Sequence, residues 1–175
     1  QKLTWMSAKF AFFADVAMIL LGGGLKLRER LTSRYSDILS WLYLATTVLK
    51  RYEADGKKKE DFPFVQWCLD YSLSNIQTAF LGLFKNLGSL FFGVRLLTQI
   101  NPVGSYPSDS LSSNIARKMQ QPGEQRDRLT HGIYLSEDQQ DPLGRLEYAF
   151  KKIHEVKPIH LKLRQAVKKK QIQKE

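Results

Sequence analysis

The sequence predicts an all-α fold: a helical bundle with two long amphipathic helices and a more loosely attached basic pair of helices at its C-terminal end. Apolar residues recur at spacings of three and four over most of the chain, which is typical of helices that bury one face. Residues that stop or start helices, such as Gly56, Pro63 and Pro142, separate these segments. No segment alternates convincingly between apolar and polar residues, as a half-buried strand would.

The first two helices are predicted on either side of a glycine run. Thr4 to Leu21 is apolar on nearly every side, so we expect a helix that is buried all round. Gly22 to Gly24 interrupts it. The stretch from Tyr35 to Tyr52 then repeats apolar residues at three-to-four spacing, which predicts the first long amphipathic helix. Gly56 suits a left-handed cap at its C-terminal end.

The second long amphipathic helix is predicted from Asp61, a suitable N-cap, to Leu87. A short apolar helix over Ser89 to Thr98 and another from Asp109 to Met119 follow. Asp141 and Pro142 favour a helix start, and Pro158 is expected to restart a last basic helix. The organisation predicted is a main bundle over 1–100, a loop-rich connection over 101–141 and basic C-terminal helices over 142–175.

Composition places the chain among globular proteins that are not built on disulfides. With 175 residues and 43% hydrophobic residues, the chain is long enough to bury a real core in one domain. Cys68 is the single cysteine, which excludes a disulfide framework and a cysteine-based zinc cluster and favours a cytoplasmic setting. The longest charge-free stretches are shorter than the roughly 20 residues of a membrane span, so we expect no transmembrane helix.

Positive charge is concentrated at the C-terminal end. The net charge is +10, and the segment from Arg145 onward carries +7 of it. A solvated tail and a contact with an anionic membrane surface are both consistent with this segment. Nucleic acid is disfavoured, because neither a recognition helix nor exposed aromatic residues accompany the charge. The candidate contacts with an anionic surface are Lys162, Arg164, Lys168, Lys169 and Lys170.

Catalytic and cofactor motifs are not recognisable. The Gly22 to Gly24 run lacks the preceding strand of a phosphate-binding loop, and the three histidines lack a carboxylate at metal-ligand spacing. Cys68 is expected to pack as a small apolar group. Asp15 and Asp37 are expected to form buried ion pairs with arginines such as Arg34 rather than to catalyse. We therefore assign no catalytic, cofactor-binding or metal-binding residue to the chain.

Several strings of residues nevertheless resemble one family. These strings lie in the segments 13–18, 21–29, 37–45, 48–52, 127–134 and 141–147, and examples are Phe13-Ala14-Asp15-Val16-Ala17-Met18 and Asp141-Pro142-Leu143-Gly144-Arg145-Leu146-Glu147. In order, and over nearly the whole chain, they are similar to the C-terminal region of the bacterial long-chain acyl-CoA dehydrogenases of FadE type.

The resemblance implies that the chain is a helical accessory domain and a fragment of a longer enzyme. Such an enzyme oxidises fatty acyl-CoA to trans-2-enoyl-CoA in β-oxidation with FAD and a glutamate base. The motif that bears the base belongs upstream of Gln1, and Glu29 lies in a different, basic context. The partners implied are the flavin-binding core of the same polypeptide, a second subunit in a homodimer, and the inner membrane of a bacterium. The alternative is a free-standing helical module that binds lipid or protein.

Overall fold

The computed structural model describes residues 1–86 and 104–169, which form two compact units over residues 1–115 and 116–175. The described residues contain six α-helices and no strand, which confirms the predicted all-α fold. The helix predicted over Ser89 to Thr98 lies outside the described residues. Each unit is considered by itself below.

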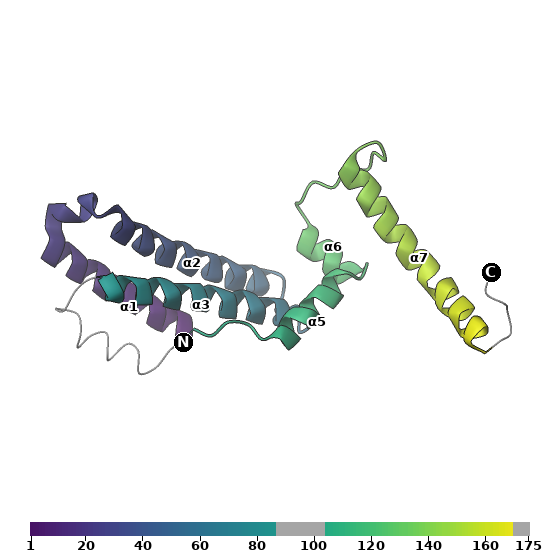
Figure 1. Cartoon of the computed structure of the whole chain (residues 1–175), viewed down its shortest axis with the longest axis horizontal. Coiled ribbons are helices and arrows are strands. Elements are labelled where there is room, and N and C mark those ends of the chain that lie inside the picture. The colour runs from purple at the N-terminus through teal and green to yellow at the C-terminus, as the bar shows by residue number, and fades with distance from the viewer. Residues whose placement is uncertain (87–103, 170–175) are drawn as a thin grey trace. The chain divides into compact units, whose positions relative to one another are not determined.

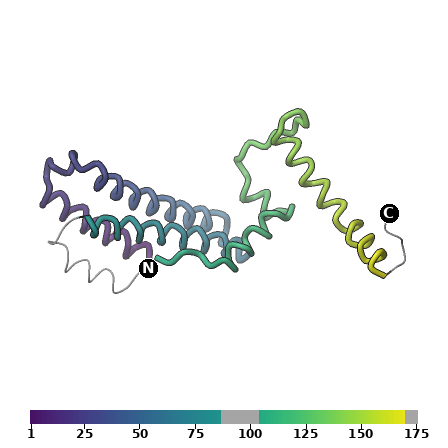
Figure 2. The backbone as a smooth tube through the Cα atoms, in the orientation of Figure 1, coloured from purple at the N-terminus to yellow at the C-terminus, as the bar shows by residue number. Residues whose placement is uncertain are grey.

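Three helices make up most of the first unit, and they lie side by side in Figures 1 and 2. They are α1 (Lys2–Leu21), α2 (Glu29–Ala54) and α3 (Phe62–Asn86). The glycine run ends α1, with Gly22 at φ 45°, and starts the 3-10 turn η1 (Gly22–Leu27). Asp55 and Gly56, at φ 83°, turn the chain from α2 toward α3. Helices α2 and α3 are the two long amphipathic helices that the sequence predicts.

The core of this unit lies where the apolar faces of the three helices meet. Ile38 of α2, Ile76 and Phe80 of α3 and Met6 of α1 are fully buried. The ring of Phe13 packs edge-on against Phe84, with 4.7 Å between ring centres. Aromatic pairs in this geometry add about 0.5–1.5 kcal/mol to the gain from apolar burial. The core therefore depends on α1 as well as on the α2–α3 pair.

Residues 104–115 return along α3. The Trp67 ring stacks on Tyr71 at 5.0 Å, and Trp67 Nε1 donates a hydrogen bond of 2.9 Å to Ser112 Oγ. Gly104 lies so close to α3 that a Cβ atom there would come within 2.1 Å of the Leu73 carbonyl oxygen. Only glycine permits this approach. Helix α5 (Asp109–Met119) begins within this returning segment.

The second unit contains α6 (Glu124–Thr130) and α7 (Pro142–Lys168). Asp141 caps α7 as predicted, because its side chain accepts a 3.1 Å hydrogen bond from the Leu143 amide. The predicted restart at Pro158 is wrong, since α7 continues through this residue as one helix. Pro158 is exposed, so water can reach the carbonyl group that its missing N–H leaves without a partner.

Candidate functional site

Helix α1 presents an apolar face away from the core. Met6, Lys9, Phe13 and Ala17 form its single buried stripe. On the other side Trp5, Phe12 and Ile19, spaced by seven residues, are 50%, 57% and 81% exposed. We call these three residues the outer face of α1. The prediction of a helix buried all round is therefore wrong, because α2 and α3 cover only one side of α1.

The same helix meets the dimensions of a membrane span. Lys2–Leu27, which joins α1 and η1, is long and apolar enough to cross a bilayer by length and composition alone. The expectation that no stretch is long enough is wrong, because it considered only uninterrupted charge-free runs. Between Thr4 and Leu21 the charged residues Lys9 and Asp15 interrupt a stretch of α1 that carries no other charge.

Lys9 is a buried cation among aromatic rings. Its side chain is 8% exposed, and its Nζ has no hydrogen-bond partner in the described part of the chain. The ammonium lies 4.5 Å from the ring centre of Phe80, 5.4 Å from that of Phe84 and 5.5 Å from that of Trp5. Burial lowers the pKa of Lys9 from 10.5 to about 8. In the sequence Lys9 lies three residues after Met6 and four before Phe13, in the row of residues that α1 buries. This spacing is the signal that could have identified Lys9 as a buried cation.

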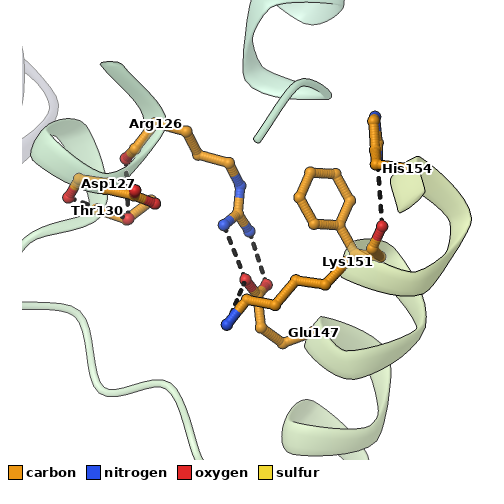
Figure 3. A network of polar contacts seen from close by, with 7 residues as sticks. Arg126, Asp127, Thr130, Glu147, Lys151 and His154 are labelled. Atoms are coloured by element: carbon orange, nitrogen blue, oxygen red, sulfur yellow. Dashed lines mark hydrogen bonds and ion pairs between the residues drawn. The ribbon is translucent and has the colours of Figure 1, made fainter. Parts of the chain in front are cut away.

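An ion pair holds α6 to α7 in the second unit (Figure 3). The guanidinium of Arg126 donates two hydrogen bonds to the Glu147 carboxylate, at 2.9 and 2.7 Å, and both side chains are largely buried. The guanidinium also lies 4.4 Å from the ring centre of Phe150. The hydrogen bond from Arg126 holds the pKa of Glu147 below its ordinary value. Arg126 was not identified from the sequence, because a loop separates it from Glu147 and sequence spacing does not fix the path of a loop.

The loop before α7 packs closely against the first turn of α7. A Cβ atom on Gly144 would come within 2.1 Å of the Asp138 carbonyl oxygen and 2.9 Å of that of Ser136. Glu147 and Gly144 belong to segment 141–147, one of those that carry the resemblance, whereas Arg126, Ser136 and Asp138 lie outside these segments. The contacts hold the start of α7.

The predicted contacts with an anionic surface are exposed at the end of α7. Lys162, Arg164 and Lys168 lie on its last two turns, and Lys169 follows directly. Lys170 lies outside the described residues. The described positions point in different directions. Arg164 directly follows Leu163 and lies beside the exposed apolar residues of α7. Lys162 is two residues, or about half a turn, from His160, so it points away from that side.

The candidate catalytic groups are not assembled. Asp15 and Asp37 are both exposed, and neither pairs with Arg28, Arg30 or Arg34 among the described residues, so the predicted buried ion pairs are wrong. Cys68 is half-buried in α3, and burial raises the pKa of its thiol, which disfavours the reactive thiolate. His154 Nδ1 lies 2.9 Å from the Phe150 carbonyl oxygen of its own helix. No group of three or more metal-ligating side chains occurs in the described ranges.

Comparison with known proteins adds one match. The family model described as acyl-CoA dehydrogenase, C-terminal, bacterial type, matches residues 1–175. No solved structure matches the chain.

Proposed function

The chain belongs to the acyl-CoA dehydrogenase C-terminal family of bacterial type, and from this premise we propose that it is a structural domain that packs on the catalytic core of its enzyme. The enzyme would oxidise fatty acyl-CoA to trans-2-enoyl-CoA in β-oxidation, on the cytoplasmic side of the bacterial inner membrane. FAD in the core would accept the electrons. The free-standing binding module is the alternative.

The described residues do not form a Rossmann-type site for FAD. The glycine run 22–24 forms a 3-10 turn between two helices rather than a loop after a strand, and the described ranges contain no strand. A Rossmann-type site holds a dinucleotide where a strand leads through such a loop into a helix N-terminus. In this proposal the flavin and the catalytic base belong to the core of the enzyme.

The outer face of α1 is the observation that carries the structural role. Trp5, Phe12 and Ile19 form an apolar row on a helix whose opposite stripe is already packed. Burying Phe12 or Ile19 fully contributes about 1.5–3 kcal/mol each. Rows of this kind mark interaction surfaces. The flavin-binding core of the same polypeptide is the occupant that family membership supplies.

A membrane contact is the second candidate function, and it has its own observation. Lys2–Leu27 has the length and composition of a span, and α7 carries exposed cations. A cation near an anionic bilayer contributes about 1 kcal/mol. A second subunit in a homodimer could cover the same outer face of α1.

The test is a charge placed on the outer face of α1 in the intact enzyme. We expect Phe12→Glu to lower flavin retention and acyl-CoA oxidation at least tenfold, because the glutamate would be buried against the core. Tyr43→Glu is the matched control, since Tyr43 is a 69% exposed aromatic residue on α2. Oxidation of short, medium and long acyl-CoA, flavin absorbance and sedimentation are measured for both variants.

Each outcome assigns the occupant of the face. Equal flavin content, activity and sedimentation in the two variants would overturn docking on the core. A Phe12→Glu protein that keeps flavin but becomes monomeric would assign the face to a second subunit. A protein that keeps flavin and subunit state but no longer sediments with bacterial lipid vesicles would assign it to the membrane. Absence of acyl-CoA oxidation in the intact wild-type protein would favour the free-standing module.

A further inference from the structure

Helix α7 carries a coiled-coil seam with no occupant among the described residues. Its side chains at alternating spacings of three and four are Leu146, Ala149, Ile153, Val156, His160, Leu163 and Val167. Seven consecutive positions follow this rule, over the length of one unbroken helix. A repeat of this kind keeps one narrow row of side chains facing a partner helix. We call this row the α7 seam.

The α7 seam is exposed from Leu146 to Leu163. Leu146 and Ile153 are 67% and 65% exposed, and Val156 and Leu163 are similarly open. Gly144 is the only residue of α7 that is buried in the described structure. Side chains of this type cost free energy when they face water. The helix is therefore built to bury this row against something beyond the residues described.

Pro158 supports a helical partner. It lies two residues from both Val156 and His160, which places it about half a turn away on the opposite side of the helix. A proline in a helix displaces the carbonyl group four residues earlier and bends the helix away from its own side. A bend of this kind at Pro158 would put the α7 seam on the concave side, which is the side that a helix wrapping around another turns toward its partner. His160 is the single polar residue in the row, a position at which coiled coils accept one polar group.

Cations border the α7 seam on both sides. Lys152 lies on one side, and Lys157 and Arg164 lie on the other, at the positions that flank a coiled-coil interface. Lys152 pairs with Glu155 at 2.7 Å, whereas Lys157 and Arg164 have no ion-pair partner among the described residues. A second copy of α7 would bring like charges together along this seam, which is unfavourable. An acidic helix would pair with them.

We propose that the α7 seam binds an amphipathic helix of another protein that carries acidic residues beside its apolar row. The strict alternation of three and four residues favours this partner over a lipid surface, because it makes a narrow seam that fits another helix, whereas a helix lying in a membrane surface buries a broader apolar face. The Arg126–Glu147 pair and the Gly144 contact hold the start of α7 in place for this contact. The proposal is independent of the docking proposed for α1.

The probe is a designed helical peptide of four heptads with leucine and isoleucine in its seam and glutamate at the flanking positions. We expect the intact polypeptide to bind it and to bind the same peptide with lysine at the flanks at least tenfold more weakly, by fluorescence anisotropy. Leu163→Asp should weaken binding of the acidic peptide at least tenfold. Leu161→Asp is the matched control, because Leu161 and Leu163 are 49% and 50% exposed but only Leu163 lies in the seam.

A second matched pair tests the charge. Lys157→Glu should weaken binding of the acidic peptide severalfold, whereas Lys162→Glu, on the opposite side of α7, should not. Circular dichroism confirms that each variant keeps its helix content. Equal binding by the two leucine variants, or no binding of the acidic peptide, would overturn the proposal. Vesicles of phosphatidylserine and phosphatidylcholine that bind only when Leu163 is intact, or a wild-type dimer lost in Leu163→Asp, would instead assign the seam to lipid or to a second copy.

Discussion

At the scale of single residues, Lys9 is a charged side chain whose burial lowers the stability of the fold. Its ammonium lies among three aromatic rings, which attract a cation, but no hydrogen bond replaces its lost hydration in the described structure. Burial lowers its pKa to about 8, so the folded chain binds this proton less tightly than the unfolded chain does. The charged form is therefore destabilising below about pH 8.

We predict that Lys9→Met stabilises the chain at pH 7 by on the order of 2 kcal/mol. This is less than the pKa shift alone implies, because the attraction between the ammonium and the aromatic rings offsets part of the cost of burying the charge. In the wild type this group makes unfolding harder as the pH rises from about 8 toward 10.5, and the variant should lose that rise. Denaturant unfolding at pH 7 and pH 10 measures both effects. Lys50→Met, at an exposed lysine of α2, is the control, and a similar change there would contradict the prediction.

Glu147 has the opposite pH dependence. Its pKa is lowered by the hydrogen bond from Arg126, so its stabilisation is present at neutral pH and is lost as the pH falls through the folded-state pKa. We predict that Glu147→Gln destabilises α7 by about 1–3 kcal/mol at pH 7, because it leaves a largely buried guanidinium unpaired. Amide exchange in residues 142–150 is the measurement.

Glu155→Gln is the control for that experiment. Glu155 also forms an ion pair of 2.7 Å, with Lys152, but both side chains are at least half exposed. Exposed pairs contribute 0 to about 1 kcal/mol. Equal acceleration of exchange in the two variants would show that the Arg126–Glu147 pair has no special role.

At the scale of elements, two glycines lie where another part of the chain comes close to a helix backbone. Gly144 meets the backbone of Ser136 and Asp138, which cannot move without displacing the loop. Gly82 in α3 faces the flexible end of the Arg34 side chain, 2.7 Å from where a Cβ atom would lie. The first approach is set by rigid backbone and the second by a side chain that can rotate away.

We predict that Gly144→Ala lowers the stability of the second unit by about 2 kcal/mol or more, because the backbone must shift. Gly82→Ala should be neutral or stabilising by up to about 1 kcal/mol, since alanine is the better helix former. Thermal unfolding followed by circular dichroism compares them. A larger loss for Gly82→Ala than for Gly144→Ala would refute this account of the two contacts.

At the scale of the whole molecule, the division into two units predicts separable stability. Phe80 is fully buried in the first unit, so Phe80→Ala should destabilise that unit by about 3–5 kcal/mol. Amide exchange should accelerate throughout α1, α2 and α3. Exchange in α7 should stay as in the wild type, and matching acceleration there would mean that the chain unfolds as one cooperative unit.

The helices follow from local signals in the sequence. The spacing of apolar residues defined α2 and α3, the glycine run ended α1, and Asp141 with Pro142 started α7, because these signals act within one or two turns of backbone. The resemblance carried by segments such as 141–147 also held, since the family model matches residues 1–175. Pro158 misled the prediction, because one missing hydrogen bond on an exposed face does not end a helix.

Which helix faces are covered depends on tertiary contacts. An apolar helix such as α1 has the same sequence pattern whether it is enclosed or packed on one side, so the exposure of Trp5, Phe12 and Ile19 could not be foreseen. The Arg126–Glu147 pair likewise joins residues whose distance depends on the path of the loop between them. Local chemistry sets a helix within a few residues, but burial and pairing depend on contacts between segments that sequence spacing does not measure.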